Sequence, residues 1–407
     1  MPIEKTQRFS ALYTRDFRLF WFGQIISLSG TWMHSVAQSW LVYSMTKSPL
    51  YLGLIASLSS LPILFFTLIG GSVADRYPKR KIIIITQSLS VIPAFTLGVL
   101  TYGEWVAIWQ VGIIAFFFGT VNAFDVPARQ AFLAEVVSKS DITNAIALNS
   151  AAFNGARIIG PLMAGFVIAN FSMPLCFFLN ALSFLPVVLA LTMINASGTA
   201  HAGNKKFFDT IREGAQFVRR EKSVFYIMSL IAIFSLFGIP YITLLPVLAD
   251  AVFSEGIKGL SLLVSSAGVG SFVAAVIIAF KGEIKDKGFY IPFAALVFSV
   301  AILGIALSGS LHFALILIFF AGWGIVSFLA VCNSFIQQAV PDGLRGRIMS
   351  FYTLVFLGLA PIGNSAIGLA AHALGTLLSL RIFAAICILS SIVFFILFRN
   401  SCGERAL

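Results

Sequence analysis

Long apolar runs separated by short polar segments follow one another along almost the whole chain. Each run holds about 20 residues or more, the length of α-helix that crosses the hydrocarbon core of a bilayer. A segment in lipid must satisfy its own backbone hydrogen bonds, and the runs lack the alternation of β-barrel strands, so we expect helices. The twelve expected spans are 17–45, 50–74, 82–102, 105–127, 142–169, 173–194, 223–249, 257–280, 289–309, 312–338, 346–370 and 376–398.

One long polar stretch, residues 195–222, divides these spans into six and six. Its first half is rich in Gly, Ala and Ser, which is typical of a flexible linker. Its second half predicts an amphipathic helix lying on the inner membrane face or across the two halves. The apolar residues of that helix are Phe208, Ile211, Ala215 and Val218. We therefore expect an N-terminal six-helix bundle over 1–194, a cytoplasmic linker, and a C-terminal bundle with a short tail over 223–407.

The two halves also resemble each other in sequence. When the chain is shifted by 203 residues, three glycines of the fifth span fall on three glycines of the eleventh. The matched pairs are Gly155 with Gly358, Gly160 with Gly363, and Gly165 with Gly368. Duplicated six-helix halves are typical of secondary transporters, whose substrate site lies near the midplane between the repeats. The general glycine richness of membrane helices is the alternative explanation.

The composition is that of a membrane protein, since 59% of the residues are hydrophobic and 11% are charged, against roughly 25% charged in soluble proteins. All but four of the 27 Lys and Arg residues fall in the termini and in the loops on their side of the predicted topology. The four exceptions are Lys47, Lys258, Arg157 and Arg381. By the positive-inside rule both termini are expected to be cytoplasmic. Topology and contact with the lipid bilayer then account for the net charge of +11 without a nucleic-acid partner.

Polar stripes run along two of the apolar spans. On the fifth span Ser150, Asn154, Arg157 and Pro161 share one helical face. On the first span the polar residues recur three or four positions apart, which places them on one face too. They are Gln24, Ser27, Thr31, His34 and Gln38. Two such stripes predict the walls of a water-filled substrate cavity.

Two residues of these stripes carry candidate chemistry. A charge inside the membrane costs at least ~2.5–3.5 kcal/mol, so Arg157 needs a cavity or a partner. We expect it either to anchor an anionic group of the substrate or to form a structural ion pair with Asp125. His34 can take a proton near physiological pH, and its alternative is a histidine that is hydrogen-bonded within helix packing.

Residues 70–81, with the sequence GGSVADRYPKRK, close the second span. They resemble the signature between helices 2 and 3 of the major facilitator superfamily, although Pro78 stands where that family usually has glycine. Gly71 is expected to allow close helix approach, and Asp75 to act as a gate carboxylate. The basic residues at head-group level include Arg76 and Arg80.

Further gate charges are expected near Asp75. Asp125 and Arg129 flank Pro127 at the inner end of the fourth span, and ordinary loop charge is the equal alternative. The segment GARIIGPLMAG in the fifth span resembles the helix-5 signature of antiporters of the same superfamily. The residues that carry this resemblance are Gly155, Gly160, Pro161 and Gly165, and a plain helix-packing seam is the alternative for them.

The segments RDFRLFWFGQIIS and NAFDVPARQAFLAEVV add a more specific resemblance. Together they are similar to the drug:proton antiporter branch, which holds macrolide efflux proteins and the enterobactin exporter. This resemblance implies an all-α membrane protein with twelve transmembrane helices in two pseudo-symmetric six-helix bundles. It also implies a monomeric, proton-coupled exporter of an amphipathic small molecule, a drug-like compound or a siderophore, in a bacterial inner membrane. An importer or a lipid flippase of the same fold is the alternative.

A membrane-embedded enzyme is the alternative of another class, and the residue pattern argues against it. Catalysis needs a converged set of nucleophile, base or metal ligands, whereas the four histidines share no ligand spacing and the four cysteines are scattered. We therefore expect no catalytic residue, no metal and no cofactor. A phosphate loop ending in Gly-Lys-Ser/Thr does not occur, which argues against ATP-driven pumping.

Overall fold

The computed structural model describes residues 10–194, 217–282, 284 and 286–402, and in this part every element is a helix. A short 3₁₀ turn, η1 (Ser10–Tyr13), precedes the first long helix. The helices of the first half are α1 (Arg15–Thr46), α2 (Pro49–Arg76), α3 (Lys79–Tyr102), α4 (Ile108–Leu133), α5 (Ile142–Asn170), α6 (Met173–Ser183) and α7 (Leu185–Met193). The predicted linker helix falls largely outside the described residues, because 195–216 are not among them.

The second half continues with helices of the same kind. They are α9 (Lys222–Ile233), η2 (Phe234–Gly238), η3 (Ile239–Leu244), α10 (Leu245–Val247), η4 (Leu248–Val252), α11 (Gly256–Lys281), α12 (Lys287–Ile305), α13 (Leu311–Ala339), α14 (Asp342–Gly358), α15 (Ala360–Leu374) and α16 (Thr376–Cys402). Each predicted span therefore coincides with one helix or with a run of consecutive helical segments.

Eleven helices in the described part of the chain are long and apolar enough to cross a membrane. The predicted span outside that set is 17–45, which corresponds to α1. At 32 residues α1 has ample length, but its polar stripe lowers its hydropathy. Of the two helices predicted as cavity walls, α5 is therefore identified as a membrane span by length and composition, and α1 is not.

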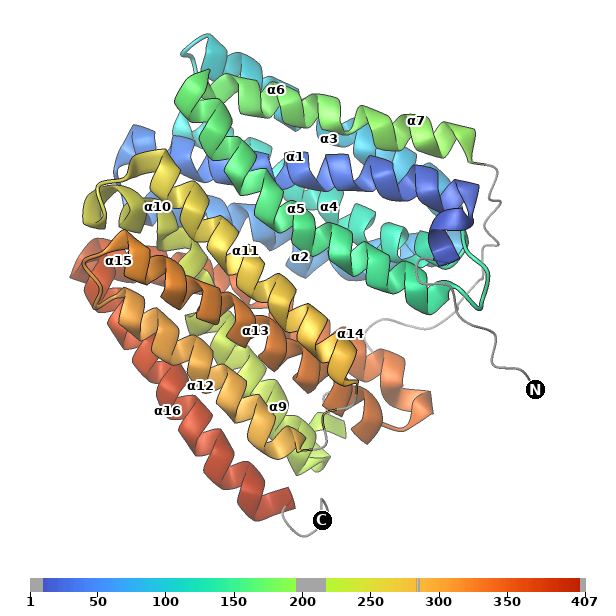
Figure 1. The fold of residues 1–407 in the computed structure, drawn as a ribbon, viewed down its shortest axis with the longest axis vertical. Helices are drawn as coiled ribbons and strands as arrows, with labels where there is room; N and C mark the ends of the chain where they lie inside the picture. The colour runs from blue at the N-terminus through green and yellow to red at the C-terminus, as the bar shows by residue number, and fades with distance from the viewer. Residues whose placement is uncertain (1–9, 195–216, 283, 285, 403–407) are drawn as a thin grey trace. The chain divides into compact units, whose positions relative to one another are not determined.

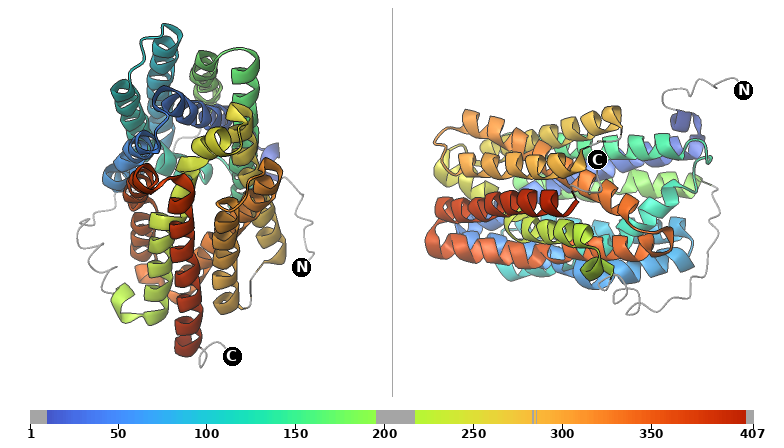
Figure 2. Two further views of the ribbon diagram at one scale, coloured as in Figure 1. Left: turned by 90° about the vertical axis from the view of Figure 1, so that its left-hand side faces the viewer. Right: turned by 90° about the horizontal axis from the view of Figure 1, so that it is seen from below.

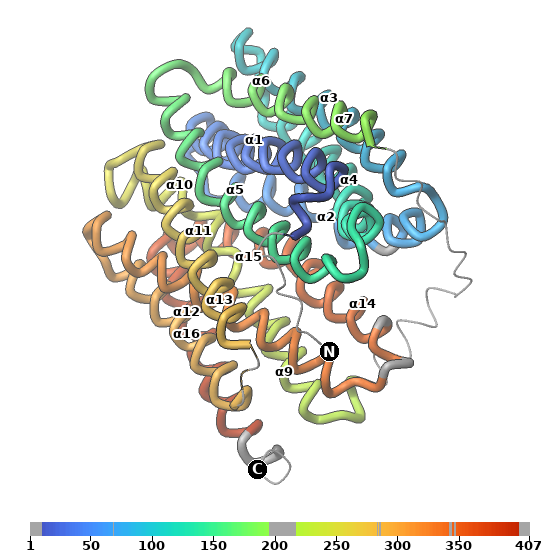
Figure 3. The backbone as a smooth tube through the Cα atoms, turned by 45° about the vertical axis from the view of Figure 1, so that its right-hand side comes forward, coloured from blue at the N-terminus to red at the C-terminus, as the bar shows by residue number. Residues whose placement is uncertain are grey.

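Prolines divide three of the spans into segments. Pro186 lies at the start of α7, and Pro361 lies at the start of α15, directly after a break at Leu359. The seventh span contains Pro240 and Pro246, and its backbone passes through π and 3₁₀ turns between α9 and η4. Proline suits the first turn of a helix, where its missing N–H leaves no hydrogen bond unmade. The path through α14 and α15 can be followed in Figure 3.

The helix α4 continues past Pro127 to Leu133, whereas its predicted span ends at residue 127. A proline has no N–H to offer the carbonyl four residues earlier, here that of Ala123. Gly70 of α2 lies against this same carbonyl, and a methyl group on Gly70 would collide with it. The missing side chain at Gly70 therefore lets α2 pack directly on the proline-weakened turn of α4.

The chain forms two compact units. Unit 1 comprises the described parts of Met1–Gln38 and Phe65–Gly203, and in it α3 packs against α4, α6 and α7. Unit 2 comprises Ser39–Leu64 and the described parts of Asn204–Leu407. In unit 2, α13 packs against α11 and α12, and α16 packs along α12 (Figures 1 and 2). Residues 39–64, where α1 turns into α2, thus pack with the second half of the chain. The predicted division at the 195–222 linker stays a prediction.

The core of unit 1 is built from aromatic and aliphatic side chains of several helices. Phe20 of α1 meets Phe132 of α4 edge to face, with ring centroids 5.1 Å apart. Both rings are fully buried, together with Ile83 of α3 and Leu191 of α7. Four helices therefore share one apolar cluster, against which the polar groups described next are held.

One pair of repeated glycines, Gly160 and Gly363, makes equivalent close contacts in the two units. A methyl group on Gly160 of α5 would come within 2.5 Å of Trp32 Cβ in α1. A methyl group on Gly363 of α15 would come within 2.7 Å of the carbonyl oxygen of Ser235 in η2. Ser235 follows Trp32 by 203 positions, the offset that also relates the two glycines. The offset of 203 residues therefore relates not only these two glycines but also the residues against which they pack.

Candidate functional site

A buried carboxylate lies at the centre of unit 1. Asp125 of α4 is 1% exposed, and its Oδ1 accepts hydrogen bonds from Thr86 Oγ1 at 2.5 Å and from Gln87 Nε2 at 3.0 Å. Its Oδ2 accepts a bond from Arg129 Nε at 2.6 Å, and Arg129 Nη2 donates to the same oxygen. Burying an ionised carboxylate is costly unless it is paired and hydrogen-bonded. Here one cation and two neutral donors supply that compensation.

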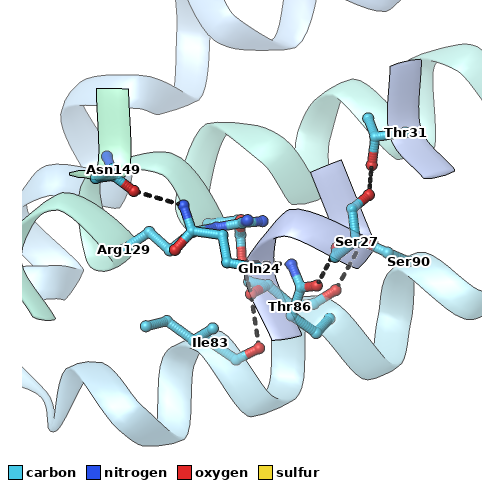
Figure 4. A network of polar contacts seen from close by, with 10 residues as sticks. Gln24, Ser27, Thr31, Ile83, Thr86, Ser90, Arg129 and Asn149 are labelled. Carbon is cyan, nitrogen blue, oxygen red and sulfur yellow. Dashed lines mark hydrogen bonds and ion pairs between the residues drawn. The ribbon is translucent and has the colours of Figure 1, made fainter. Parts of the chain in front are cut away.

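The polar stripe of α1 joins this carboxylate to the neighbouring helices. Ser27 Oγ donates to Gln87 Oε1 at 3.1 Å, and Thr31 Oγ1 donates to the Ser27 carbonyl at 2.9 Å. Gln24 Nε2 donates to Asn149 Oδ1 on α5 at 2.8 Å (Figure 4). Gln24 and Ser27 are buried. Gln24 and Ser27 were predicted to line a cavity wall, but the hydrogen bonds they make connect α1 to α5 and α3 inside unit 1.

His34 is enclosed by aromatic rings. Its imidazole stacks on Phe118 at 5.4 Å between centroids and meets Phe177 edge to face at 5.0 Å. The ring is 2% exposed, and its Nε2 lies 3.2 Å from Gln38 Oε1. This geometry favours the alternative for His34, a histidine held within helix packing, over a place in a water-filled wall.

Arg157 of α5 lies over an aromatic ring. The carbon of its guanidinium is 5.5 Å from the centroid of the Trp32 ring on α1, a cation–π distance. Its neighbour Asn154 is buried and donates to the Ser150 carbonyl of its own helix at 2.9 Å. The alternative for Arg157, an ion pair with Asp125, has to be corrected, because the cation that pairs with Asp125 is Arg129. Arg129 follows Asp125 by four residues and therefore lies on the same face of the same helix.

Sequence comparison assigns the class of this helical molecule. A family model described as a transmembrane secretion effector, of the major facilitator type, matches residues 6–405. The chain belongs to this family. It is a secondary transporter of the major facilitator superfamily and a multi-pass membrane protein, as the sequence motifs indicated.

Two curated relatives of the transporter match most of its length. It is 25% identical to the staphyloferrin A transporter of Staphylococcus aureus, over 94% of this chain and 96% of the relative. It is 24% identical to the multidrug efflux pump Tap of Mycolicibacterium fortuitum, over 88% of this chain and 89% of that pump. A crystal structure of a POT family transporter in complex with 5-aminolevulinic acid matches with a TM-score of 0.77 at 11% identity, covering 95% of this chain and 96% of the other. The structural match confirms the predicted major facilitator fold.

The signature segment 70–81 makes structural contacts at the ends of helices in the transporter. Arg80 Nε donates to the Leu191 carbonyl at 2.6 Å, and Arg80 Nη2 donates to the Thr192 carbonyl at 3.1 Å. These carbonyls end α7, where a cation is also favoured by the helix dipole. Lys79 Nζ forms an ion pair with Glu135 at 2.9 Å. Asp75 and Arg76 are exposed, and their role as gate charges stays a prediction.

The predicted glycine contacts hold at some positions and fail at others. Gly160 packs closely against α1, and its neighbours Pro161 and Gly165 are buried. A methyl group on Gly155 or on Gly71 would meet nothing within 4 Å among the described residues. The close approach expected at Gly71 is found one position earlier, at Gly70, because the exposed carbonyl of α4 faces that residue.

A charged contact in unit 2 was not foreseen from the sequence. Lys47, in the turn between α1 and α2, forms an ion pair with Asp250 of η4 at 2.8 Å, and its Nζ lies 4.8 Å from the Tyr43 ring centroid. Nearby, Ser57 Oγ donates to the Pro361 carbonyl at 2.8 Å. The sequence holds no signal for this pair, because Lys47 and Asp250 lie 203 residues apart and belong to no motif.

Proposed function

We propose that the transporter is a proton-coupled exporter that moves an amphipathic small molecule by alternating access. The cargo classes are a drug-like compound or a siderophore, carrying an anionic group. The names of the two curated relatives, a siderophore transporter and a multidrug efflux pump, support this proposal. The transporter lies in a bacterial inner membrane with both termini in the cytoplasm, and it acts as a monomer.

The observation that carries the proposal is the guanidinium of Arg157 over the Trp32 ring. A guanidinium stays charged and presents a planar fork of donors, which suits carboxylate or catecholate oxygens in a bidentate arrangement. An aromatic ring beside it offers an apolar face to the rest of an amphipathic molecule. Arg157 therefore binds the anionic group of the cargo, and Trp32 packs against its apolar body. Thr31 and Gln38, which are half-buried on α1, line the path of the cargo.

The inner gate is formed by the signature segment. Asp75 holds this gate closed when the protein opens outward, and Arg76 stays at head-group level. Arg80 keeps its contacts to α7 throughout, because those carbonyls belong to the same unit. Asp75→Asn weakens the closed gate and shifts the population toward inward-open states.

Export is tested by comparing cells that carry the gene, lack it, or carry Arg157→Ala. The probes are staphyloferrin A, erythromycin and ethidium, together with untargeted profiling of the medium. We expect at least one anionic compound to be depleted from the medium of cells lacking the gene and of Arg157→Ala cells. Accumulation of that compound inside gene-carrying cells would favour an importer instead. An altered distribution of lipids between leaflets, with no change in the medium, would favour a flippase.

A further inference from the structure

The ion pair of Asp125 and Arg129 is accompanied by two complementary buried atoms. Among the described residues, Arg129 Nη1 has no acceptor and Gln24 Oε1 has no donor. Both side chains are otherwise engaged, Arg129 with Asp125 and Gln24 with Asn149. Leaving a buried polar group unsatisfied costs roughly 1–3 kcal/mol. Two such atoms in one polar cluster indicate a second arrangement in which they bind each other.

We propose that Asp125 carries the transported proton and that Arg129 exchanges acceptors between Asp125 and Gln24. When a hydronium ion gives its proton to Asp125 Oδ2, a neutral carboxyl group and a water molecule result, and no other bond is broken. The protonated oxygen no longer attracts the guanidinium, so Arg129 turns its Nη1 to Gln24 Oε1. This inference rests on the proposed proton coupling and assigns its site.

The surroundings of Asp125 make this exchange specific. Arg129 is the cation that contacts it from α4, while α3 contributes the neutral Thr86 and Gln87. Ser27 of α1, which is also neutral, is connected to Asp125 through its hydrogen bond to Gln87. The Lys79–Glu135 pair, with Lys79 at the start of α3 and Glu135 just beyond α4, is neutral as a whole. Protonation therefore changes the net charge of the buried cluster from zero to plus one.

That added charge couples the proton to the cargo. An uncompensated cation in the protein interior is unfavourable, so the protonated cluster favours a conformation in which Arg129 reaches water or another acceptor. Gln24 also donates to Asn149 of α5, the helix that carries Arg157. Movement of Arg129 toward Gln24 is thus transmitted from α4 through α1 to the cargo-binding helix.

Infrared difference spectroscopy on the full chain in lipid, without cargo, tests the assignment. Stepwise acidification should produce the C=O band of a protonated carboxyl group in the wild type. Because all 16 Asp and Glu residues add to this band as the pH falls, the spectrum of each variant is subtracted from that of the wild type. The difference should show that one buried carboxyl component is lost in Asp125→Asn and retained in Glu135→Gln, the matched control at the other acid of this region. A component that persists in Asp125→Asn, or disappears only in Glu135→Gln, would overturn the proposal.

If Asp125→Asn does not fold, a second pair of variants tests whether Asp125 binds the proton and Arg129 changes its acceptor. Arg129→Gln removes the competing cation and should move the band to higher pH by about one unit or more, a tenfold change in proton binding. Gln24→Leu removes the second acceptor of Arg129 and should move the band to lower pH. The shift in Arg129→Gln is expected for any cation removed from beside a carboxylate, so Gln24→Leu is the variant that tests the exchange. An unchanged midpoint in Gln24→Leu would also overturn the proposal.

The band is measured without cargo, so it separates this inference from the proposed function. If the band behaves as expected but wild-type vesicles move no probe in response to a pH gradient, proton-coupled export fails and the proton-binding site stands. If transport follows the pH gradient and the band does not depend on Asp125, the assignment of the site fails and the proposed function stands.

Discussion

Lys47 and Asp250 pair at 2.8 Å although 203 residues separate them in the chain. Lys47 lies in the turn after α1, where its φ is 48°, and Asp250 lies within η4. Both residues belong to unit 2, so the ion pair joins the turn between α1 and α2 to the end of the seventh span.

The first prediction concerns that contact. Lys47→Ala should increase hydrogen exchange in the turn between α1 and α2, and the exchanged pair Lys47→Asp with Asp250→Lys should restore protection. The cost in stability should be less than about 1 kcal/mol, because the side chains are 60% and 32% exposed and solvent screens such pairs. Lys258→Ala, which removes the other lysine of the predicted outer loops, serves as control. Equal exchange in both single variants would refute the role of the pair.

The same contact has a defined pH dependence. The hydrogen bond to Asp250 raises the pKa of Lys47 above its usual value. A raised lysine pKa means that the stabilisation is fully present at neutral pH and is lost as the pH rises through the folded-state pKa. Protection of the turn against hydrogen exchange, corrected for the intrinsic rate, should therefore stay constant across neutral pH and fall only in alkaline solution. An alkaline loss of the same size in Lys47→Ala, which lacks the amine, would contradict this prediction.

Glycine substitutions separate a packing contact from an open position. Gly160→Ala should lower thermal stability, since its methyl group would come within 2.5 Å of Trp32 Cβ and 2.7 Å of the Ser29 carbonyl. Overpacking of this kind costs roughly 1–3 kcal/mol. Gly155→Ala, on the same helix, should leave stability unchanged. Melting curves of the detergent-solubilised variants provide the comparison, and equal loss at both positions would show that the close approach is not where the structure has it.

The end of α7 provides a further test. Arg80→Ala removes two donors from the carbonyls of Leu191 and Thr192 and should speed proteolysis and hydrogen exchange around residues 189–194. Arg80→Lys keeps the charge but not the fork, so an intermediate effect is expected. Arg76→Ala, at an exposed position of the same segment, is the control and should leave α7 unchanged. Similar exchange in Arg80→Ala and wild type would show that Arg80 does not stabilise this helix end.

Periodicity and residue type were sufficient to predict the helices, because each apolar run must become a helix in lipid. The partner of Asp125 could also have been foreseen, since Arg129 lies four residues further along the same helix. The choice between Gly70 and Gly71 could not be foreseen, because it depends on which way the carbonyl freed by Pro127 faces. Ser27 and His34 illustrate a similar limit. A polar stripe predicts that polar groups surround the helix. Whether those groups are water molecules or side chains of another helix depends on the packing of α3, α4 and α6.

The role of Arg157 is tested by two substitutions. Arg157→Lys keeps the charge but loses the fork and should impair transport of the anionic member of the cargo panel while the protein still inserts. Arg157→Ala should weaken binding of that cargo by roughly 10- to 100-fold, as loss of a charged hydrogen bond of about 1.5–3 kcal/mol implies. Trp32→Phe should be milder, because an aromatic face remains. Unchanged cargo affinity in Arg157→Ala would exclude the anchor role.

Proton-driven export can be measured in everted membrane vesicles with an acidic interior. The cargo found by profiling should accumulate inside these vesicles as protons leave, and nigericin should abolish the accumulation by collapsing the pH gradient. Asp125→Asn vesicles should fail to accumulate the cargo. Accumulation that survives nigericin, or that is the same in Asp125→Asn and wild-type vesicles, would contradict these predictions.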